Sequence, residues 1–308
     1  MVYEEVMPCL KLYKIRRINM IEITILSGKG GAGKTSVAAA IASLSKNAVF
    51  CDNDVDAADL HLILDPDIKE RFSFDSGTVA YINNDSCTDC GLCYEKCRFD
   101  AIHRNSSGLL EVNPYQCEGC RLCERICPEK AISSFNNENN NWFISETRFG
   151  PLVHAKMGAG EENSGKLVTE IRKNAKNIAT KINADFIISD GSPGIGCPVI
   201  ASVTGTDRVL LVIEPSKSGL HDAERLNELV MSFNVPTFAV INKYDINPEI
   251  TANTEKFLTD NNIPLLGKIP FDKSFVDSMV SGETIIEYEP DSALSKEFKS
   301  IWEKLISQ

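Results

Sequence analysis

The chain has 308 residues, with 32 Lys and Arg against 43 Asp and Glu, which gives a formal net charge of −11. This acidic balance disfavours a polyanion-binding surface, so nucleic acid is not an expected partner. Hydrophobic residues make up 43% of the sequence and charged residues 24%, as in ordinary globular proteins, and no apolar run is long enough to span a bilayer. A membrane partner is therefore not expected either.

The first 19 residues precede a second methionine, Met20, and contain several basic residues. They lack the continuous apolar stretch and the small-residue cleavage site of a signal peptide. We expect residues 1–19 to be a disordered extension or the product of a misassigned start. A short helix packed on the body of the protein is the alternative.

Strand and helix patterns alternate over most of the chain. Apolar, β-rich runs typical of buried parallel strands occur at 21–27, 47–51, 185–189, 208–213, 236–241 and 264–269. Helical patterns follow them at 34–45, 164–182, 219–233, 248–261, 272–280 and 292–306. This alternation predicts an α/β domain whose mostly parallel sheet is covered by helices on both faces.

The alternation is interrupted once. Short strands are expected over 71–82, a cysteine-rich segment covers 85–132, and the polar run at 136–141 is typical of a loop. We therefore assign 20–70 and 145–308 to the α/β domain. Residues 83–136 are predicted to form a small α+β domain that is inserted into the larger one.

Residues 28–35 read GKGGAGKT and match the phosphate-binding pattern G-x-x-x-x-G-K-[ST] between a buried strand and a helix. Such a loop turns backbone N–H groups and a helix N-terminus toward phosphates. We expect Lys34 to reach the β- and γ-phosphates and the Thr35 hydroxyl to bind Mg²⁺. The predicted nucleotide-binding residues of this loop are Gly28, Gly30, Gly31, Gly33, Lys34, Thr35 and Ser36.

The loop contains a second lysine, Lys29, in the pattern K-G-G-x-G-K-[ST]. This variant resembles the MinD/ParA and nitrogenase-iron-protein class of P-loop ATPases, and the resemblance extends over nearly the whole chain outside the cysteine-rich segment. It implies an ATP-hydrolysing P-loop NTPase that forms a nucleotide-dependent homodimer. It also implies that Lys29 reaches the nucleotide of the partner subunit, with a solvated loop lysine as the alternative.

Three aspartates are expected near the phosphates. Asp190 ends a buried strand, and a carboxylate at that position can hold the shell of a Mg²⁺ ion beside the loop. The run Asp52-Asn53-Asp54 resembles the first switch segment of the family, and the residues after Asp190 resemble the second. We expect Asp54 to orient the attacking water and Asp52 to hold the Mg²⁺ shell. The predicted catalytic residues are Lys29, Lys34, Asp52 and Asp54.

The base-binding segment can be interpreted in two ways. In the family that the chain resembles, an asparagine at the position of Asn242 and a segment like that of Pro270 and Asp272 contact adenine. Asn242, Lys243 and Asp245 also match the N-K-x-D pattern of GTPases, whose aspartate pairs with guanine. The resemblance favours ATP, and GTP is the alternative.

Eleven cysteines are many for this length, and eight of them lie between Cys87 and Cys127. Without a secretory signal, clustered cysteines indicate metal ligands and a cytoplasmic location. Two C-x₂-C-x₂-C-x₃-C runs have the spacing of bacterial ferredoxins with two [4Fe–4S] clusters, in which the fourth cysteine of each run ligates the other cluster. The predicted ligands are Cys87, Cys90, Cys93 and Cys127 for cluster one, and Cys117, Cys120, Cys123 and Cys97 for cluster two. Zinc is the alternative metal.

The remaining cysteines are Cys9, Cys51 and Cys197. Cys51 is expected to be a small buried apolar residue at the end of a strand. Cys197 follows Asp190 in the second switch segment, where the nitrogenase iron protein has a cluster-ligating cysteine at a similar offset. Ordinary loop packing is the other interpretation of Cys197.

Residues 150–200 look very like those of MinD-superfamily ATPases with an inserted ferredoxin domain. The leading prediction is that ATP turnover in a dimer gates electron transfer through the two clusters to a redox partner. The alternatives are an assembly or carrier ATPase that serves an apo-metalloprotein, and a positioning ATPase of the MinD or ParA kind. A membrane anchor is disfavoured, because the apolar residues of the last helix are expected to pack on the sheet: Leu294, Phe298, Ile301, Trp302 and Leu305.

Overall fold

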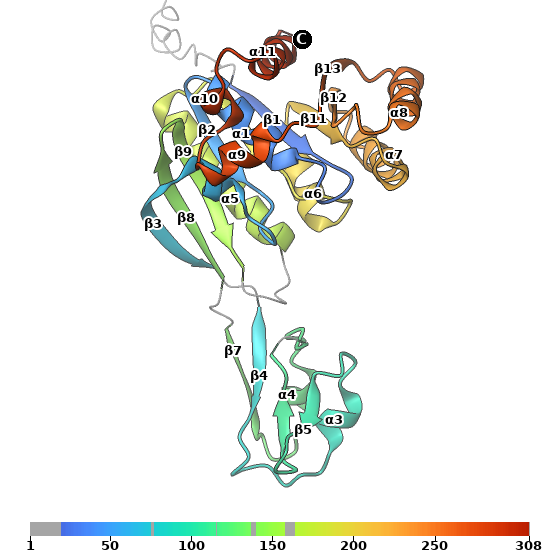
Figure 1. Cartoon of the computed structure of the whole chain (residues 1–308). Coiled ribbons are helices and arrows are strands. Elements are labelled where there is room, and N and C mark those ends of the chain that lie inside the picture. The colour runs from blue at the N-terminus through green and yellow to red at the C-terminus, as the bar shows by residue number, and fades with distance from the viewer. Residues whose placement is uncertain (1–19, 75–76, 115, 137–139, 158–163, 308) are drawn as a thin grey trace, which may run out of the picture.

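The computed structural model describes residues 20–74, 77–114, 116–136, 140–157 and 164–307. Figure 1 shows one large α/β body and a smaller body joined to it by two strands. The extension at 1–19, with Cys9, lies outside the described residues, so its expected state stays a prediction.

The large body is built on a nine-stranded sheet with the order β13-β12-β11-β1-β10-β2-β9-β8-β3. All neighbours from β13 to β9 pair in parallel, and only β8 runs in the opposite direction. This confirms the predicted mostly parallel sheet. The strands are β1 (Ile21–Leu26), β2 (Ala48–Asp52), β3 (Asp67–Phe74), β8 (Asn140–Thr147), β9 (Gly150–Lys156), β10 (Phe186–Asp190), β11 (Arg208–Ile213), β12 (Thr237–Asn242) and β13 (Leu265–Ile269).

Helices cover both faces of this sheet, as the sequence predicts (Figure 1). Alternate strand residues face opposite sides, so Ile23 and Ile25 of β1 join one apolar core and Leu26 joins the other. The first core is closed by α1 (Lys34–Leu44), α2 (Leu60–Leu64), α10 (Ile285–Tyr288) and α11 (Ala293–Ile306), with α9 (Ser274–Val280) between them in the chain. The opposite side is covered by α5 (Ser164–Ile182), α6 (Cys197–Val203), α7 (Lys217–Met231) and α8 (Pro248–Asp260).

Helix α11 packs on the sheet. Its apolar side chains are buried, with exposed fractions between 0% and 7%, as expected for a helix of the core: Leu294, Phe298, Ile301, Trp302 and Leu305. In the described ranges, no helix combines the length and the apolar character that crossing a bilayer requires.

The edge of the sheet differs from the sequence-based expectation. The run at 136–141 was expected to be a loop, but Asn136 ends a strand and Asn140 begins β8, with 137–139 outside the described residues. The sheet thus includes 67–74 and 140–147, which extends beyond the expected limits at 70 and 145. Cross-strand packing explains this, since Phe72 of β3 stacks on its partner Trp142 of β8 with ring centroids 4.1 Å apart.

The small body, which we call the cysteine module, covers residues 78–136 and lies beyond the ends of β3 and β8 (Figure 1). It contains two antiparallel pairs, β4 (Thr78–Ile82) with β7 (Ile132–Asn136), and β5 (Ile102–Arg104) with β6 (Leu110–Val112). Each cysteine run carries one short helix, α3 (Leu92–Lys96) or α4 (Leu122–Ile126). The module therefore has the α+β content expected of the insertion, but it begins at Thr78, before the expected limit at 83, and ends at the expected limit at 136.

Candidate functional site

The glycine-rich loop between β1 and α1 has a backbone that demands glycine. Gly31 and Gly33 have φ angles of 82° and 89°, in the left-handed region that side chains rarely adopt. A Cβ on Gly33 would lie 2.2 Å from Nδ2 of Asn242, which itself donates to the carbonyl of Ala32 at 2.9 Å. The end of β12 therefore packs directly against the glycine-rich loop.

Lys34 sits at the centre of a buried cluster of charges. Its Nζ lies 2.6 Å from Oδ1 of Asp190 and 3.3 Å from Oδ2 of Asp54, and the lysine is 6% exposed. The Thr35 hydroxyl donates to the other oxygen of Asp190 at 2.7 Å. Burial lowers the pKa of Lys34, but the carboxylates of Asp190 and Asp54 outweigh it and hold the pKa above its ordinary value. The cluster thus keeps a cation at the N-terminus of α1, where phosphates would bind.

Asp52 and Asp54 have different surroundings. Asp52 is fully buried, and its two oxygens accept the backbone N–H groups of Asp54 at 3.2 Å and Leu60 at 3.1 Å. Burial, reinforced by Asp190, raises its pKa well above the usual range. Asp54 faces Lys34 and lines the pocket described below, and burial raises its pKa too. In this structure Asp54 is open to a ligand, whereas Asp52 holds the turn that places Asp54.

Lys29 points away from the other loop residues. Its Nζ donates to the hydroxyls of Ser216 at 3.0 Å and Ser218 at 3.2 Å, and lies 3.9 Å from Glu214. It does not line the pocket of its own subunit among the residues described. In this subunit the ammonium of Lys29 is thus held at the start of α7, and its role across a dimer stays a prediction.

A pocket of about 440 Å³ brings the predicted nucleotide site together. It gathers the loop, Asp54 and the base segment, and is lined by Ser27, Gly30, Gly31, Gly33, Lys34, Thr35, Ser36, Asp54, Ala57, Asp59, Pro193, Asn242, Lys243, Pro270, Phe271, Asp272, Phe275, Val276 and Met279. Five of the nucleotide-site residues predicted from sequence do not line it: Gly28, Lys29, Asp52, Asp190 and Asp245. The lysine Lys243 donates to the carbonyl of Gly31 at 3.0 Å.

The pocket also contains residues that sequence reasoning missed. Phe271, Val276 and Met279 are 53%, 60% and 44% exposed and present apolar surface beside the loop. The only sequence signal for them is their place just after Pro270, in the predicted helix at 272–280. Asp245, in contrast, is turned to the backbone and accepts the N–H of Phe271 at 2.7 Å.

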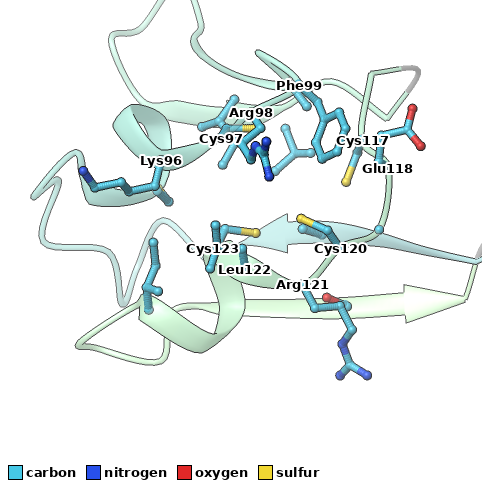
Figure 2. A pocket seen from close by; sticks show the side chains of 18 residues that line it. Lys96, Cys97, Arg98, Phe99, Cys117, Glu118, Cys120, Arg121, Leu122 and Cys123 are labelled. Carbon is cyan, nitrogen blue, oxygen red and sulfur yellow. The ribbon is translucent and has the colours of Figure 1, made fainter.

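The eight cysteines of the module gather around two cavities. One cavity is lined by Cys93, Cys97, Cys117, Cys120 and Cys123. Figure 2 shows the sulfurs of Cys117, Cys120 and Cys123 pointing into a common space. The other cavity is lined by Cys87, Cys90, Cys93 and Cys127. The structure thus gathers cysteines of both runs into two rings, and Cys93 lines both cavities; the assignment of four ligands to each cluster stays a prediction.

The chemistry of these two rings fits iron–sulfur clusters. Thiolates are the ligands of such clusters, and backbone N–H groups of Asp89 and Ala131 donate to the sulfurs of Cys87 and Cys127. Within the described residues, no group of three or more His, Cys, Asp or Glu side chains is placed to hold a single metal ion. Burial and neighbouring thiols raise the pKa of Cys123 to about 11, so a positively charged group is needed to hold these sulfurs as thiolates.

The two other described cysteines differ. Cys51 is fully buried, as predicted, and burial raises its pKa to about 12, so it is an inert core residue. Cys197 is exposed at the start of α6, and its Cβ would lie 3.1 Å from a Cβ on Gly165 of α5. In the described part of the chain, no other cysteine shares its surroundings.

The sheet, the glycine-rich loop and the charged pocket define a P-loop nucleotide-binding protein. Residues 23–285 match the CobQ/CobB/MinD/ParA nucleotide binding domain. An uncharacterized protein of Methanocaldococcus jannaschii is 36% identical over 93% of this chain and 96% of its own. The chain belongs to the CobQ/CobB/MinD/ParA family, and it is an ATPase of the MinD/ParA type.

More distant relatives differ in their named roles. The iron-sulfur cluster carrier protein of Pyrococcus horikoshii is 24% identical over 93% of this chain and 86% of its own. Among solved structures, the septum site-determining protein MinD of Pyrococcus horikoshii with Mg-ADP superposes with a TM-score of 0.57 at 18% identity, covering 92% of this chain and 95% of that one. This last likeness concerns the fold.

Proposed function

We propose that this protein is an ATP-hydrolysing iron–sulfur protein, in which a nucleotide-gated homodimer couples ATP turnover to electron transfer through two [4Fe–4S] clusters. One observation carries the proposal: eight cysteines line two cavities in a module inserted between β3 and β8 of the ATPase sheet. Any rearrangement of that sheet edge on nucleotide binding changes the position of the module.

The roles within the pocket follow from its geometry. Lys34 would leave its carboxylates to bind the β- and γ-phosphates of ATP, while Thr35 and Asp190, already paired at 2.7 Å, would hold Mg²⁺ directly and through water. Asp54 would orient the attacking water. Lys29 would enter the partner's site, where a positive charge stabilises the charge that develops on the phosphates. Asn242, Lys243, Pro270 and Asp272 would surround the base, with Mg-ATP favoured over GTP.

The roles within the module follow from the two cysteine rings. Cys87, Cys90, Cys93 and Cys127 would hold cluster one, and Cys97, Cys117, Cys120 and Cys123 would hold cluster two. Such clusters supply one-electron chemistry when bound. Cys90 and Cys120 are exposed, so each ring has one edge at the surface, where a redox partner could exchange electrons. The two rings share one small core, which keeps the clusters close together.

The test is anaerobic purification followed by iron analysis and EPR-monitored reduction, with and without Mg-ATP. We expect about eight irons per chain and a spectrum or potential that shifts with nucleotide. The Lys34→Ala variant should keep the iron and lose the shift, whereas Lys46→Ala, an exposed lysine just after α1, should keep both. Eight irons with no nucleotide response would contradict the gating part of the proposal.

A second candidate function is delivery of a cluster to an apo-metalloprotein, which the iron-sulfur cluster carrier relatives favour. The exposed Cys197 is the residue that could hold a labile cluster, together with its copy in a dimer. Incubation of the loaded protein with an apo-ferredoxin tests this candidate. Transfer that depends on Cys197 would favour it over electron transfer. A positioning role is a weaker candidate, because the apolar face of α11 is buried in the core.

A further inference from the structure

Arg148 lies at a junction of the molecule that sequence reasoning does not identify. It occupies the turn between β8 and β9, at the end of β8 opposite to the cysteine module. With ~3.4 Å per residue, the eight residues of β8 span roughly 27 Å between that turn and the module. β8 pairs with β3 along its length, and these two strands join the module to the sheet.

The guanidinium of Arg148 contacts two segments that adjoin the nucleotide pocket, α2 after Asp59 and the turn after α9. It binds the carboxylate of Glu287 in a bidentate pair, with Nε–Oε1 at 2.6 Å and Nη2–Oε2 at 2.8 Å. Nη2 also donates to the carbonyls of Ile63 at 2.9 Å and Gly282 at 3.1 Å. The group lies over the ring of Phe149, 4.7 Å from its centroid. One side chain thus joins α2, the α9–α10 segment and the β8–β9 turn.

The two segments whose carbonyls accept from Arg148, α2 and the turn after α9, are connected to groups that line the nucleotide pocket. Helix α2 starts at Leu60, whose N–H is held by Asp52, and Asp52 also holds the N–H of Asp54 beside Lys34. Gly282 follows α9, which supplies Phe275, Val276 and Met279 to the pocket wall. A nucleotide that moves Asp54 or α9 therefore moves groups bonded to Arg148.

We propose that Arg148 is a positioning residue for the nucleotide pocket and links its occupancy to the β3–β8 pair that carries the cysteine module. The second half of this inference rests on the proposed function, because it names the route by which nucleotide reaches the module. The bidentate geometry explains why arginine stands here: a planar fork binds a carboxylate and backbone carbonyls in one plane, which the ammonium of lysine cannot do.

The test uses the full-length, iron-loaded protein and its Arg148→Lys variant. Mg-ADP affinity is measured by calorimetry, and amide hydrogen exchange in β3 and β8 is measured with and without a non-hydrolysable ATP analogue. We expect Arg148→Lys to keep the iron content, to bind Mg-ADP about 3- to 10-fold more weakly, and to lose the nucleotide-dependent change in exchange. Glu287→Gln should reproduce the direction of both effects.

Arg71→Lys is the matched control. Arg71 lies on β3, binds Asn141 across the same strand pair at 3.1 Å, and touches neither wall of the pocket. It should leave nucleotide affinity and the exchange response unchanged. The inference is overturned if Arg148→Lys behaves like Arg71→Lys, or if wild-type β3 and β8 show no response to nucleotide. A response in exchange without any change in the EPR spectrum would instead support Arg148 and contradict electron gating.

Discussion

The sheet domain and the cysteine module are stabilised by different means. The sheet buries three large apolar clusters on its two faces, and its charged pocket is added at the ends of the strands. Among its described residues the module has eight buried apolar side chains, four of which are alanines or Cys93, and five further cysteines pack against its core. A core this small stabilises a fold only weakly, and under the proposed function metal bound to the cysteines would supply the missing free energy.

The largest effect is expected from removal of iron, which should act on the module and not on the sheet domain. Chelating the iron should unfold residues 78–136 while the sheet domain stays folded, since the core of the module packs against the proposed cluster ligands and the cores of the sheet domain do not. Limited proteolysis and hydrogen exchange report on the module. Fluorescence reports on the sheet domain alone, because both tryptophans, Trp142 and Trp302, lie there. Its unfolding free energy should change by less than about 0.5 kcal/mol; loss of both bodies together would mean that they fold as one.

The next effect concerns the pocket. Lys34→Ala removes the cation that three buried carboxylates face, so we expect ATP hydrolysis to fall by about 100-fold or more. The variant should also lower the stability of the nucleotide-free protein by about 3 kcal/mol, because Asp190 keeps a buried, unpaired charge. Steady-state kinetics and urea denaturation measure the two effects, with Lys46→Ala as control. If the EPR spectrum of the variant without nucleotide equals that of the wild type, the pocket and the module are stabilised independently of each other.

A smaller effect is expected from His154 of β9. It is 5% exposed, and burial together with His61 lowers its pKa to about 4, so the folded protein prefers the neutral ring. Since the unfolded chain titrates near 6.5, stability is full above that pH and is lost as pH falls from 6.5 toward 4. Between pH 7 and pH 5 the loss should be about 2 kcal/mol.

His154→Gln should flatten this dependence, measured by urea denaturation followed by tryptophan fluorescence. His221→Gln is the control, because His221 is 68% exposed on α7. The raised pKa values of Asp52 and Asp54 act in the opposite direction, so the difference between variant and wild type isolates the histidine. Equal pH slopes for wild type and His154→Gln would show that the ring titrates normally.

The smallest effect is expected from Asp245. Its carboxylate is committed to the N–H of Phe271 and does not line the pocket, so Asp245→Ala should change the ATP-to-GTP preference by less than about 3-fold. A carboxylate that paired with guanine would instead dominate the preference when removed. Competition binding with Mg-ATP and Mg-GTP distinguishes these results, and a large shift would favour the GTPase interpretation of the N-K-x-D motif.

Much of the fold and of the pocket could be predicted from local sequence. The strand–helix alternation gives the parallel sheet, and the spacing of Gly28 to Thr35 gives the phosphate loop, because both are set by residues close in the chain. Strand β8, which lies next to the edge strand β3, was missed. Its first residues, Asn140 and Asn141, look like loop residues, and only the Phe72–Trp142 stack and the pairing with β3 make them a strand.

The difference between Asp52 and Asp54 could not be predicted either. The two carboxylates lie two residues apart in one motif, and only the turn toward Leu60 buries one and exposes the other to the pocket. Arg148 gives no local signal at all, since its partners Ile63 and Glu287 are 85 and 139 residues away. Cysteine spacing was more informative, because a run of four ligands defines its own geometry.

The pairing of β3 with β8 also has a consequence for how such a protein could be built or rebuilt. Phe74 and Asn140 are direct cross-strand partners, so the whole module occupies the position at which an ordinary β-hairpin would have a turn. A two-residue Asn-Gly turn should be able to replace residues 75–139 and restore an uninterrupted hairpin. Conversely, the edge of this sheet offers an anchoring point for grafting other small cofactor domains onto an ATP-driven scaffold.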